Sequence, residues 1–394
     1  MSASTIVTSG IPSVGRSAAA SAATQSIAEL GVASLLGAGC VQQEILTPPM
    51  IKSLSKVTVS ILLPFFLCTS IIKSVSKYGL SKSQLAVPLL GIIQCSVLYI
   101  VTTQLTFPML GIDNDTDDGR CTAVCCSFGN SGVIPLIFAE SLFRQSANAD
   151  YVDQATAFVS LYLVGWSPFF WSFGRSILIR SDTKANGTIS FKEKLMVTLK
   201  SALPPPVKGV FIGLLIATTP LCRLFLRSSD GNERVPLAVI FNSVANFGRA
   251  ASPLSLLILV SSLAVGAGVG NYSTISQKES KQTCDDKDSV PLLKRWAVVS
   301  ITRFLLSPAV MYGLLSVAKW IDLIGNSNEN PMLWFILILE ATMPPAQNSV
   351  TMLQVADRGE DAALMAMFLF SVYATSMIPV VLVLTLALGK FNLA

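Results

Sequence analysis

The uncharged stretch between Lys82 and Asp113 constrains this chain more than any other feature of its sequence. A helix needs about 20 largely apolar residues to cross the hydrocarbon core of a bilayer, and this stretch is longer than that. A second uncharged stretch lies between Asp361 and Lys390. Such stretches predict membrane-spanning helices, because lipid leaves backbone polar groups without partners unless a helix or a closed barrel pairs them.

The composition agrees with a membrane protein. Charged residues make up 13% and hydrophobic residues 52% of the 394 residues, and the mean hydropathy is +0.61. A soluble domain carries about 25% charged residues, so this chain has too little polar surface to cover a soluble fold. The net charge of +5 is scattered, with no basic run interleaved with aromatic residues, which argues against a nucleic-acid partner.

Histidine is absent, so the commonest general base and metal ligand is missing. The eight cysteines lie mostly inside apolar stretches, where cysteine packs as a small hydrophobic residue. The sequence therefore predicts neither an enzyme nor a bound metal or cofactor.

Ten apolar ranges predict membrane-spanning helices: 24–42, 52–72, 83–112, 120–142, 154–178, 204–222, 235–266, 293–320, 331–355 and 362–388. A short polar segment, 180–200, separates the first five from the last five. An odd number of spans in each half would give the two halves opposite orientations in the membrane, as in many carrier folds.

We therefore expect an all-α polytopic membrane protein of two inverted five-helix repeats. The repeats would cover residues 24–179 and 201–394, with the cytosolic linker 180–200 between them. Residues 1–23 are rich in Ser, Ala and Thr and are typical of either a disordered tail or an organelle-targeting segment.

Two of the ten ranges, the fourth of each half, contain an interruption. Pro344 and Pro345 lack backbone N–H groups and clash with the preceding turn, so a helix must break there. Gly129-Asn-Ser-Gly-Val-Ile-Pro135 interrupts the fourth range in the same way. Two interrupted segments in corresponding halves point to the binding site of a secondary transporter.

The interruptions place polar groups at membrane depth. A broken helix exposes N-terminal ends, whose free N–H groups and partial positive charge suit a carboxylate. The predicted substrate-binding residues are Asn130, Ser131, Gln347 and Asn348, and the predicted helix-breaking residues are Gly129, Gly132, Pro135, Pro344 and Pro345. The alternative is a pair of proline kinks in which the amides bridge neighbouring helices.

Charged residues inside the predicted spans are the remaining candidates. Glu340 lies four residues before Pro344 and is a candidate proton-coupling group, although it could also sit at a cavity mouth or pair with Arg303. Arg175, Arg249 and Arg303 are placed near span ends, where long side chains reach the polar interface.

Three motifs resemble the auxin efflux carrier family, in particular its PIN-LIKES branch. They are Gly129-Asn-Ser-Gly-Val-Ile-Pro-Leu136, Leu203-Pro-Pro-Pro-Val-Lys-Gly209 and Met343-Pro-Pro-Ala-Gln-Asn-Ser-Val350. The resemblance implies that broken helices four and nine cross, that spans 1, 2, 6 and 7 form a scaffold, and that the other spans move against it like an elevator. It also implies an auxin-like organic anion as substrate, a homodimer through the scaffold, and the endoplasmic reticulum membrane, with the plasma membrane as the other location.

The leading hypothesis is thus a secondary transporter of a small organic anion such as indole-3-acetate. The alternative is a cation-coupled carboxylate symporter or antiporter of the bile-acid or sodium–proton type, which Glu340 motivates.

Overall fold

The computed structural model describes residues 13–79, 81–143, 150–179, 204–226, 235–266, 268–269 and 290–393. In these ranges the fold is all-helical, and the one extended pairing is an isolated antiparallel bridge between Gly129 and Pro345. The all-α class that the sequence predicts is therefore confirmed.

Helices occupy parts of all ten predicted ranges. The first half contains α1 (Ser13–Gln42), α2 (Pro48–Val57), η1 (Thr58–Leu62), α3 (Leu63–Tyr78), α4 (Lys82–Val101), η2 (Thr102–Thr106), α5 (Phe107–Leu110), α6 (Asp117–Ser127), α7 (Val133–Phe143), α8 (Asp150–Phe169), η3 (Phe170–Gly174) and α9 (Arg175–Leu178). The second half contains α11 (Pro205–Thr218), α12 (Cys222–Phe225), α13 (Ala238–Arg249), α14 (Ala251–Gly266), α16 (Leu292–Ile301), η5 (Thr302–Leu306), α17 (Ser307–Trp320), α18 (Pro331–Thr342), α19 (Asn348–Val355) and α20 (Gly359–Phe391).

Five of the described helices are long and apolar enough to cross a membrane: Pro48–Tyr78, Lys82–Leu110, Ala238–Val265, Leu292–Trp320 and Gly359–Phe391. Shorter apolar helices accompany them, at Gly31–Gln42, Ile134–Phe143, Pro205–Thr218 and Pro331–Thr342. The helix α1 begins at Ser13, inside the range assigned to the N-terminal tail, while residues 1–12 and the linker 180–200 lie outside the described residues.

Short π-helical turns interrupt several long helices, and three of them end two residues before a proline. The turns η1, η2 and η5 precede Pro64, Pro108 and Pro308, respectively. A proline removes one backbone donor and crowds the preceding turn, and a wider turn accommodates that defect without breaking the helix. Pro64 thus lies just after a π turn in a helix that continues from Pro48 to Tyr78.

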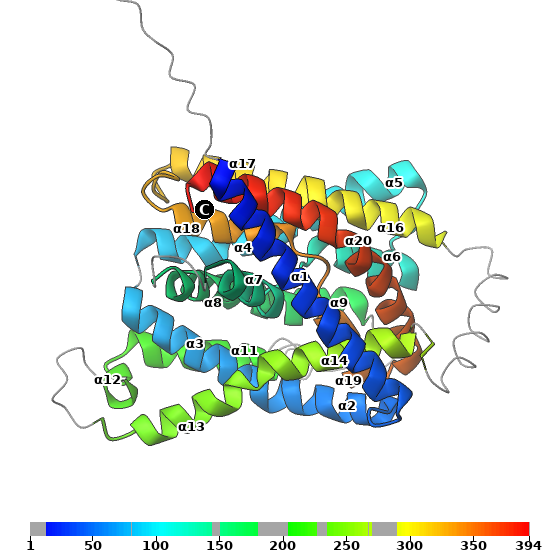
Figure 1. Cartoon of the computed structure of the whole chain (residues 1–394), viewed down its shortest axis with the longest axis horizontal. Coiled ribbons are helices and arrows are strands. Elements are labelled where there is room, and N and C mark those ends of the chain that lie inside the picture. The colour runs from blue at the N-terminus through cyan, green and yellow to red at the C-terminus, as the bar shows by residue number, and fades with distance from the viewer. Residues whose placement is uncertain are drawn as a thin grey trace, which may run out of the picture.

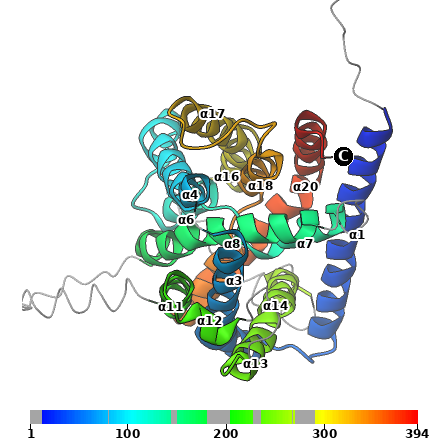
Figure 2. The same cartoon turned by 90° about the vertical axis from the view of Figure 1, so that its left-hand side faces the viewer.

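The helices form two groups on either side of α7 and α8. Figures 1 and 2 show α3, α11, α13 and α14 on one side, which we call the lower group, and α4, α16, α17 and α18 on the other, the upper group. The helix α1 crosses the edge of the molecule and packs against α14, α20 and α7.

Ion pairs join helix 48–78 to other segments near both of its ends. Lys52 forms an ion pair with Asp357, in the turn between α19 and α20. At the other end Lys77 forms an ion pair with Asp153 of α8, with Nζ and Oδ2 2.5 Å apart. Two residues of this helix between the pairs, Leu63 and Leu67, line the candidate site.

The contact between α3 and α11 depends on a glycine. A Cβ on Gly209 would lie 2.4 Å from the Pro64 carbonyl oxygen and 2.6 Å from the Pro64 Cα. We expect Gly209→Ala to destabilise the protein by about 1–3 kcal/mol, because backbone atoms cannot give way as a side chain can. The measurement is the thermal unfolding of purified protein in detergent. Gly313→Ala is the matched control, since a Cβ there meets nothing within 4 Å, and an equal effect of both substitutions would contradict this account.

Candidate functional site

Two helices are interrupted at the centre of the molecule. The first interruption separates Ser127, the end of α6, from Val133, the start of α7. The second separates Thr342, the end of α18, from Asn348, the start of α19. Within the first interruption Gly132 has a φ of +112°, a conformation that residues with a Cβ rarely adopt.

The two interruptions bind each other directly. The backbone N–H of Asn130 donates to the Pro344 carbonyl at 2.7 Å, and that of Ala346 donates to the Phe128 carbonyl at 2.9 Å. These reciprocal bonds flank the antiparallel bridge between Gly129 and Pro345. Backbone groups that leave the helices at membrane depth are thus paired inside the protein, as lipid surroundings require.

The Asn130 side chain belongs to this crossing. Its Nδ2 donates to Tyr373 Oη at 2.7 Å and lies 3.3 Å from Gln347 Oε1, and Tyr373 in turn donates to the Pro345 carbonyl at 2.8 Å. Asn130 is 3% exposed. It therefore joins the two interruptions to α20. Tyr373 could not be predicted from the sequence, because a tyrosine inside an apolar span gives no distinctive signal.

The placement of Arg303 near a span end was wrong. Arg303 lies in the π turn η5, near the middle of helix 292–320, and is 2% exposed. Its Nε and Nη2 donate to the Met343 carbonyl at 3.0 and 2.9 Å, and Nη2 also contacts the Ala341 carbonyl at 3.3 Å. The guanidinium thus binds the carbonyls freed where α18 ends, which compensates for its distance from water.

Arg249, in contrast, is the last residue of α13 and is exposed. Its Nη1 donates to Asn246 Oδ1 of the same helix at 3.3 Å. The two arginines could not be told apart from hydropathy alone, because a single charge inside a long apolar range does not reveal which way the side chain points.

Gly129 makes room for the Arg303 side chain. A Cβ on Gly129 would lie 2.1 Å from Arg303 Nη2. The guanidinium therefore lies directly against the first interruption while it binds the carbonyls of the second.

Glu340 is buried in the last turn of α18, with 1% of its surface exposed. Neither of its carboxylate oxygens has a hydrogen-bond partner in the part of the chain that the structure describes. Its polar neighbours include the Ser131 hydroxyl, which is also unpartnered, and Arg303. Glu340 therefore does not sit at a cavity mouth, and among the described residues it forms no direct ion pair with Arg303.

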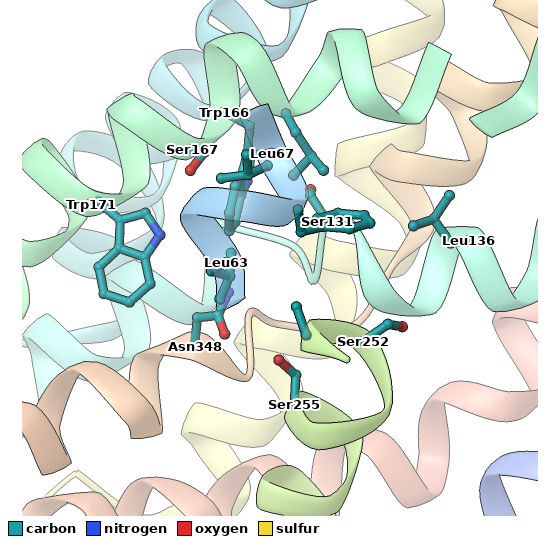
Figure 3. Close-up of a pocket in the computed structure, with 14 residues that line it drawn as sticks. Leu63, Leu67, Ser131, Leu136, Trp166, Ser167, Trp171, Ser252, Ser255 and Asn348 are labelled. Atoms are coloured by element: carbon teal, nitrogen blue, oxygen red, sulfur yellow. The ribbon is translucent and has the colours of Figure 1, made fainter. Parts of the chain in front are cut away.

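A cavity lies between the interruptions and the lower group (Figure 3). It holds about 470 Å³ of unfilled space when the open space at its mouth is included. Its walls are Leu63, Phe66, Leu67, Ser131, Gly132, Leu136, Leu163, Trp166, Ser167, Trp171, Ala251, Ser252, Ser255 and Asn348. The interruptions, α8 and the lower group thus all contribute to it, and we call it the central cavity.

Four buried polar atoms of the cavity wall have no hydrogen-bond partner. They are Ser131 Oγ, Trp166 Nε1, Ser167 Oγ and Trp171 Nε1. Figure 3 shows the Trp171 indole nitrogen turned toward the centre of the cavity. A buried donor without a partner costs free energy, so these atoms mark a place where a polar ligand would be stabilised.

Two helix N-termini also converge on the central cavity. Ser131 and Gly132 immediately precede α7, and Asn348 is the first residue of α19. The N-terminal end of a helix carries a partial positive charge and free N–H groups. Both electrostatics and hydrogen bonding therefore favour an anion here, with no lysine or arginine side chain among the described residues of the wall.

A smaller cavity adjoins the central one on the other side of Asn348. Gln347 and Asn348 line it with Thr58, Ser255 and Thr351, among others. A larger apolar groove lies between α3, α11 and α13, with Lys208 at its side. No residue of that groove carries a buried, unpartnered polar side-chain atom, so the central cavity is the better candidate for ligand recognition.

The predicted site residues are therefore divided between two roles. Ser131, Gly132 and Asn348 line the central cavity, while Asn130 and Gln347 join the interruptions to each other. Gly129, Pro344 and Pro345 form the crossing, and Pro135 is buried in the first turn of α7. The sequence analysis missed the two tryptophans of the cavity wall, although their place in an apolar range was plain.

Comparison with known proteins decides the family. A family model described as a membrane transport protein matches residues 22–383, which is most of the chain. The chain belongs to this family. It is the auxin efflux carrier family that the three motifs resemble, so the predicted membership is confirmed, and the protein is an integral membrane transporter rather than an enzyme.

Curated relatives in this family come from Arabidopsis thaliana. Protein PIN-LIKES 7 is 27% identical over 183 residues, covering 46% of this chain and 40% of that protein. Protein PIN-LIKES 1 is 23% identical over 282 residues, covering 62% of this chain and 54% of that protein. The match thus spans about half the length of these relatives, and the similarity is distant.

Proposed function

We infer that this membrane transport protein is a secondary carrier of small organic anions. The observation that carries the proposal is the central cavity, where two helix N-termini, Asn348 and four unpartnered buried polar atoms meet. The carboxylate would lie between Ser131 and Asn348. An apolar body would rest against Leu63, Leu67 and Leu163.

Auxin is the proposed substrate class. The similarity to the PIN-LIKES relatives supports an aromatic monocarboxylate such as indole-3-acetate. The indole N–H groups of Trp166 and Trp171 and the hydroxyl of Ser167 would meet a polar group at the other end of the molecule. By resemblance we place the carrier in the endoplasmic reticulum membrane, as a homodimer through its scaffold spans.

We further propose ten spans in two inverted five-helix repeats. The third spans of the two halves are alike, since each has a π turn that begins at a threonine, Thr102 or Thr302, six residues before a proline; Thr58–Pro64 has the same pattern in the second span. The reciprocal backbone bonds of the crossing also suit a two-fold relation.

We propose an elevator-type movement that carries the crossing past helix 48–78. This movement would have to break the ion pairs that the helix forms with Asp153 and Asp357.

The test is uptake of labelled organic anions by purified protein in proteoliposomes. The panel would contain indole-3-acetate, a second aromatic monocarboxylate and a dicarboxylate, with protein-free liposomes as the control for passive entry. We expect saturable uptake of indole-3-acetate. Uptake of no member of the panel above the passive rate would overturn the proposed function.

Glu340 favours the cation-coupled alternative over a simple uniporter, because a buried and unpartnered carboxylate is costly inside a membrane span.

A further inference from the structure

The Arg303 guanidinium is a charged neighbour of the Glu340 carboxyl group. Arg303 binds the carbonyls of Ala341 and Met343, which directly follow Glu340. Yet the guanidinium and the carboxylate are not joined by an ion pair or a hydrogen bond, although both side chains are described in full. Two opposite charges that are buried this close together would normally pair, since pairing offsets part of their desolvation.

This arrangement fits a protonated Glu340. An ionised carboxylate without a partner is far more costly to bury than a neutral carboxyl group. The neutral group has an O–H donor, and the unpartnered Ser131 hydroxyl beside it is an acceptor. Ser131 also lines the central cavity, so one hydroxyl touches both the carboxyl group and the proposed anion site.

Protonation leaves the Arg303 charge uncompensated. Three titratable residues lie near Glu340 or Arg303: Tyr162 of α8, Cys95 of α4 and Cys126 of α6. All three are uncharged in their protonated forms, so none of them compensates the charge of Arg303. On α20, Tyr373 is bonded within the crossing. The other described titratable groups on α8, α17 and α20 lie toward the ends of the spans: Asp150, Tyr151, Asp153, Tyr312, Lys319, Glu360, Asp361 and Lys390.

We propose that Glu340 and Arg303 make the carrier a proton–anion symporter, in which Glu340 holds one proton while the anion is bound. The proposal rests on the proposed function and names its coupling ion. With Glu340 neutral, the buried Arg303 charge attracts an anion to the adjacent cavity. When the anion leaves, Glu340 gives up its proton and the carboxylate compensates Arg303 in its place.

The proton and the anion therefore favour each other's binding. Each lowers the free energy of binding the other, as any coupling between two sites must be reciprocal. A metal cation is a poor substitute for the proton, since it would lie beside a buried guanidinium of the same sign. One proton moves with one monoanion, so the transport cycle carries no net charge.

The experiment uses the full-length chain in proteoliposomes and initial rates of labelled indole-3-acetate uptake, corrected with protein-free liposomes. Wild-type uptake should rise several-fold when the outside is one pH unit more acidic than the lumen. It should not respond to a potassium–valinomycin potential at equal pH. Uptake driven by the potential and indifferent to the pH gradient would overturn the proposal, whereas absence of any uptake would count against the proposed function instead.

The Glu340→Gln variant tests whether Glu340 carries the coupled proton. Glutamine mimics the neutral, anion-binding form, so this variant should still exchange labelled for unlabelled anion while losing the response to the pH gradient. Its residual net uptake should become sensitive to the membrane potential. Glu360→Gln is the matched control on the exposed first turn of α20 and should behave as wild type.

Two results with Glu340→Gln would overturn the assignment. One is a wild-type response to the pH gradient. The other is a variant that melts normally in detergent but exchanges no anion. If the variant does not fold, the wild-type comparison of pH gradient with potential still decides whether protons are coupled.

Discussion

Arg303→Met should destabilise the folded protein by about 3 kcal/mol or more and abolish transport. Breaking a buried, hydrogen-bonded charge is among the most costly single substitutions, because the groups it leaves behind lose their partner far from water. Here the carbonyls of Ala341 and Met343 would lose their donor, and no charge would remain to compensate an ionised Glu340. The measurement is thermal unfolding in detergent, together with the fraction of protein that elutes as a single species.

Two further variants separate the causes of that effect. Arg303→Lys keeps the charge but cannot reach two carbonyls with a planar fork, so it should recover only part of the stability. Arg249→Met makes the same change at the exposed arginine of α13 and should have little effect on unfolding. If Arg249→Met is as destabilising as Arg303→Met, the role assigned to the crossing is wrong.

Asn348→Ala should reduce uptake of the anion at least tenfold with little loss of stability. The amide is half-buried, it lines both cavities, and it follows the backbone break at the start of α19. Loss of one well-placed hydrogen bond to a charged group costs about 1.5–3 kcal/mol, which is a tenfold to more than hundredfold change in affinity. The measurement is the concentration dependence of the initial uptake rate.

The controls use the same chemical change at other amides. Asn242→Ala, at an exposed position of α13, should leave uptake unchanged. Asn130→Ala should instead lower the melting temperature, because Asn130 bonds to Tyr373 in the crossing rather than lining the cavity. Equal transport by wild type and Asn348→Ala would contradict the proposal that Asn348 binds the substrate.

Much of this architecture is visible in the sequence because its signals are local. Uncharged stretches locate helices, and prolines identify where a helix cannot continue. The Pro344–Pro345 pair and the glycines at 129 and 132 therefore indicate both interruptions, and the structure places backbone breaks at 128–132 and 343–347.

The partition of roles around the breaks depends on contacts between distant segments. Asn130 and Asn348 look equivalent in sequence, yet one is bonded to Tyr373, 243 positions away, and the other faces the cavity. Arg303 is another such case, since its partners become available only where α18 stops short of Pro344. Such pairings follow from how the two groups of helices pack, which no local pattern encodes.

The most direct test of the central claim is a structure of the carrier with indole-3-acetate, or with the best-transported anion of the panel, bound. The account predicts the ligand in the central cavity, with its carboxylate within hydrogen-bond distance of the Asn348 amide and the Ser131 hydroxyl. A ligand found instead in the apolar groove between α3, α11 and α13, with the central cavity empty, would contradict it.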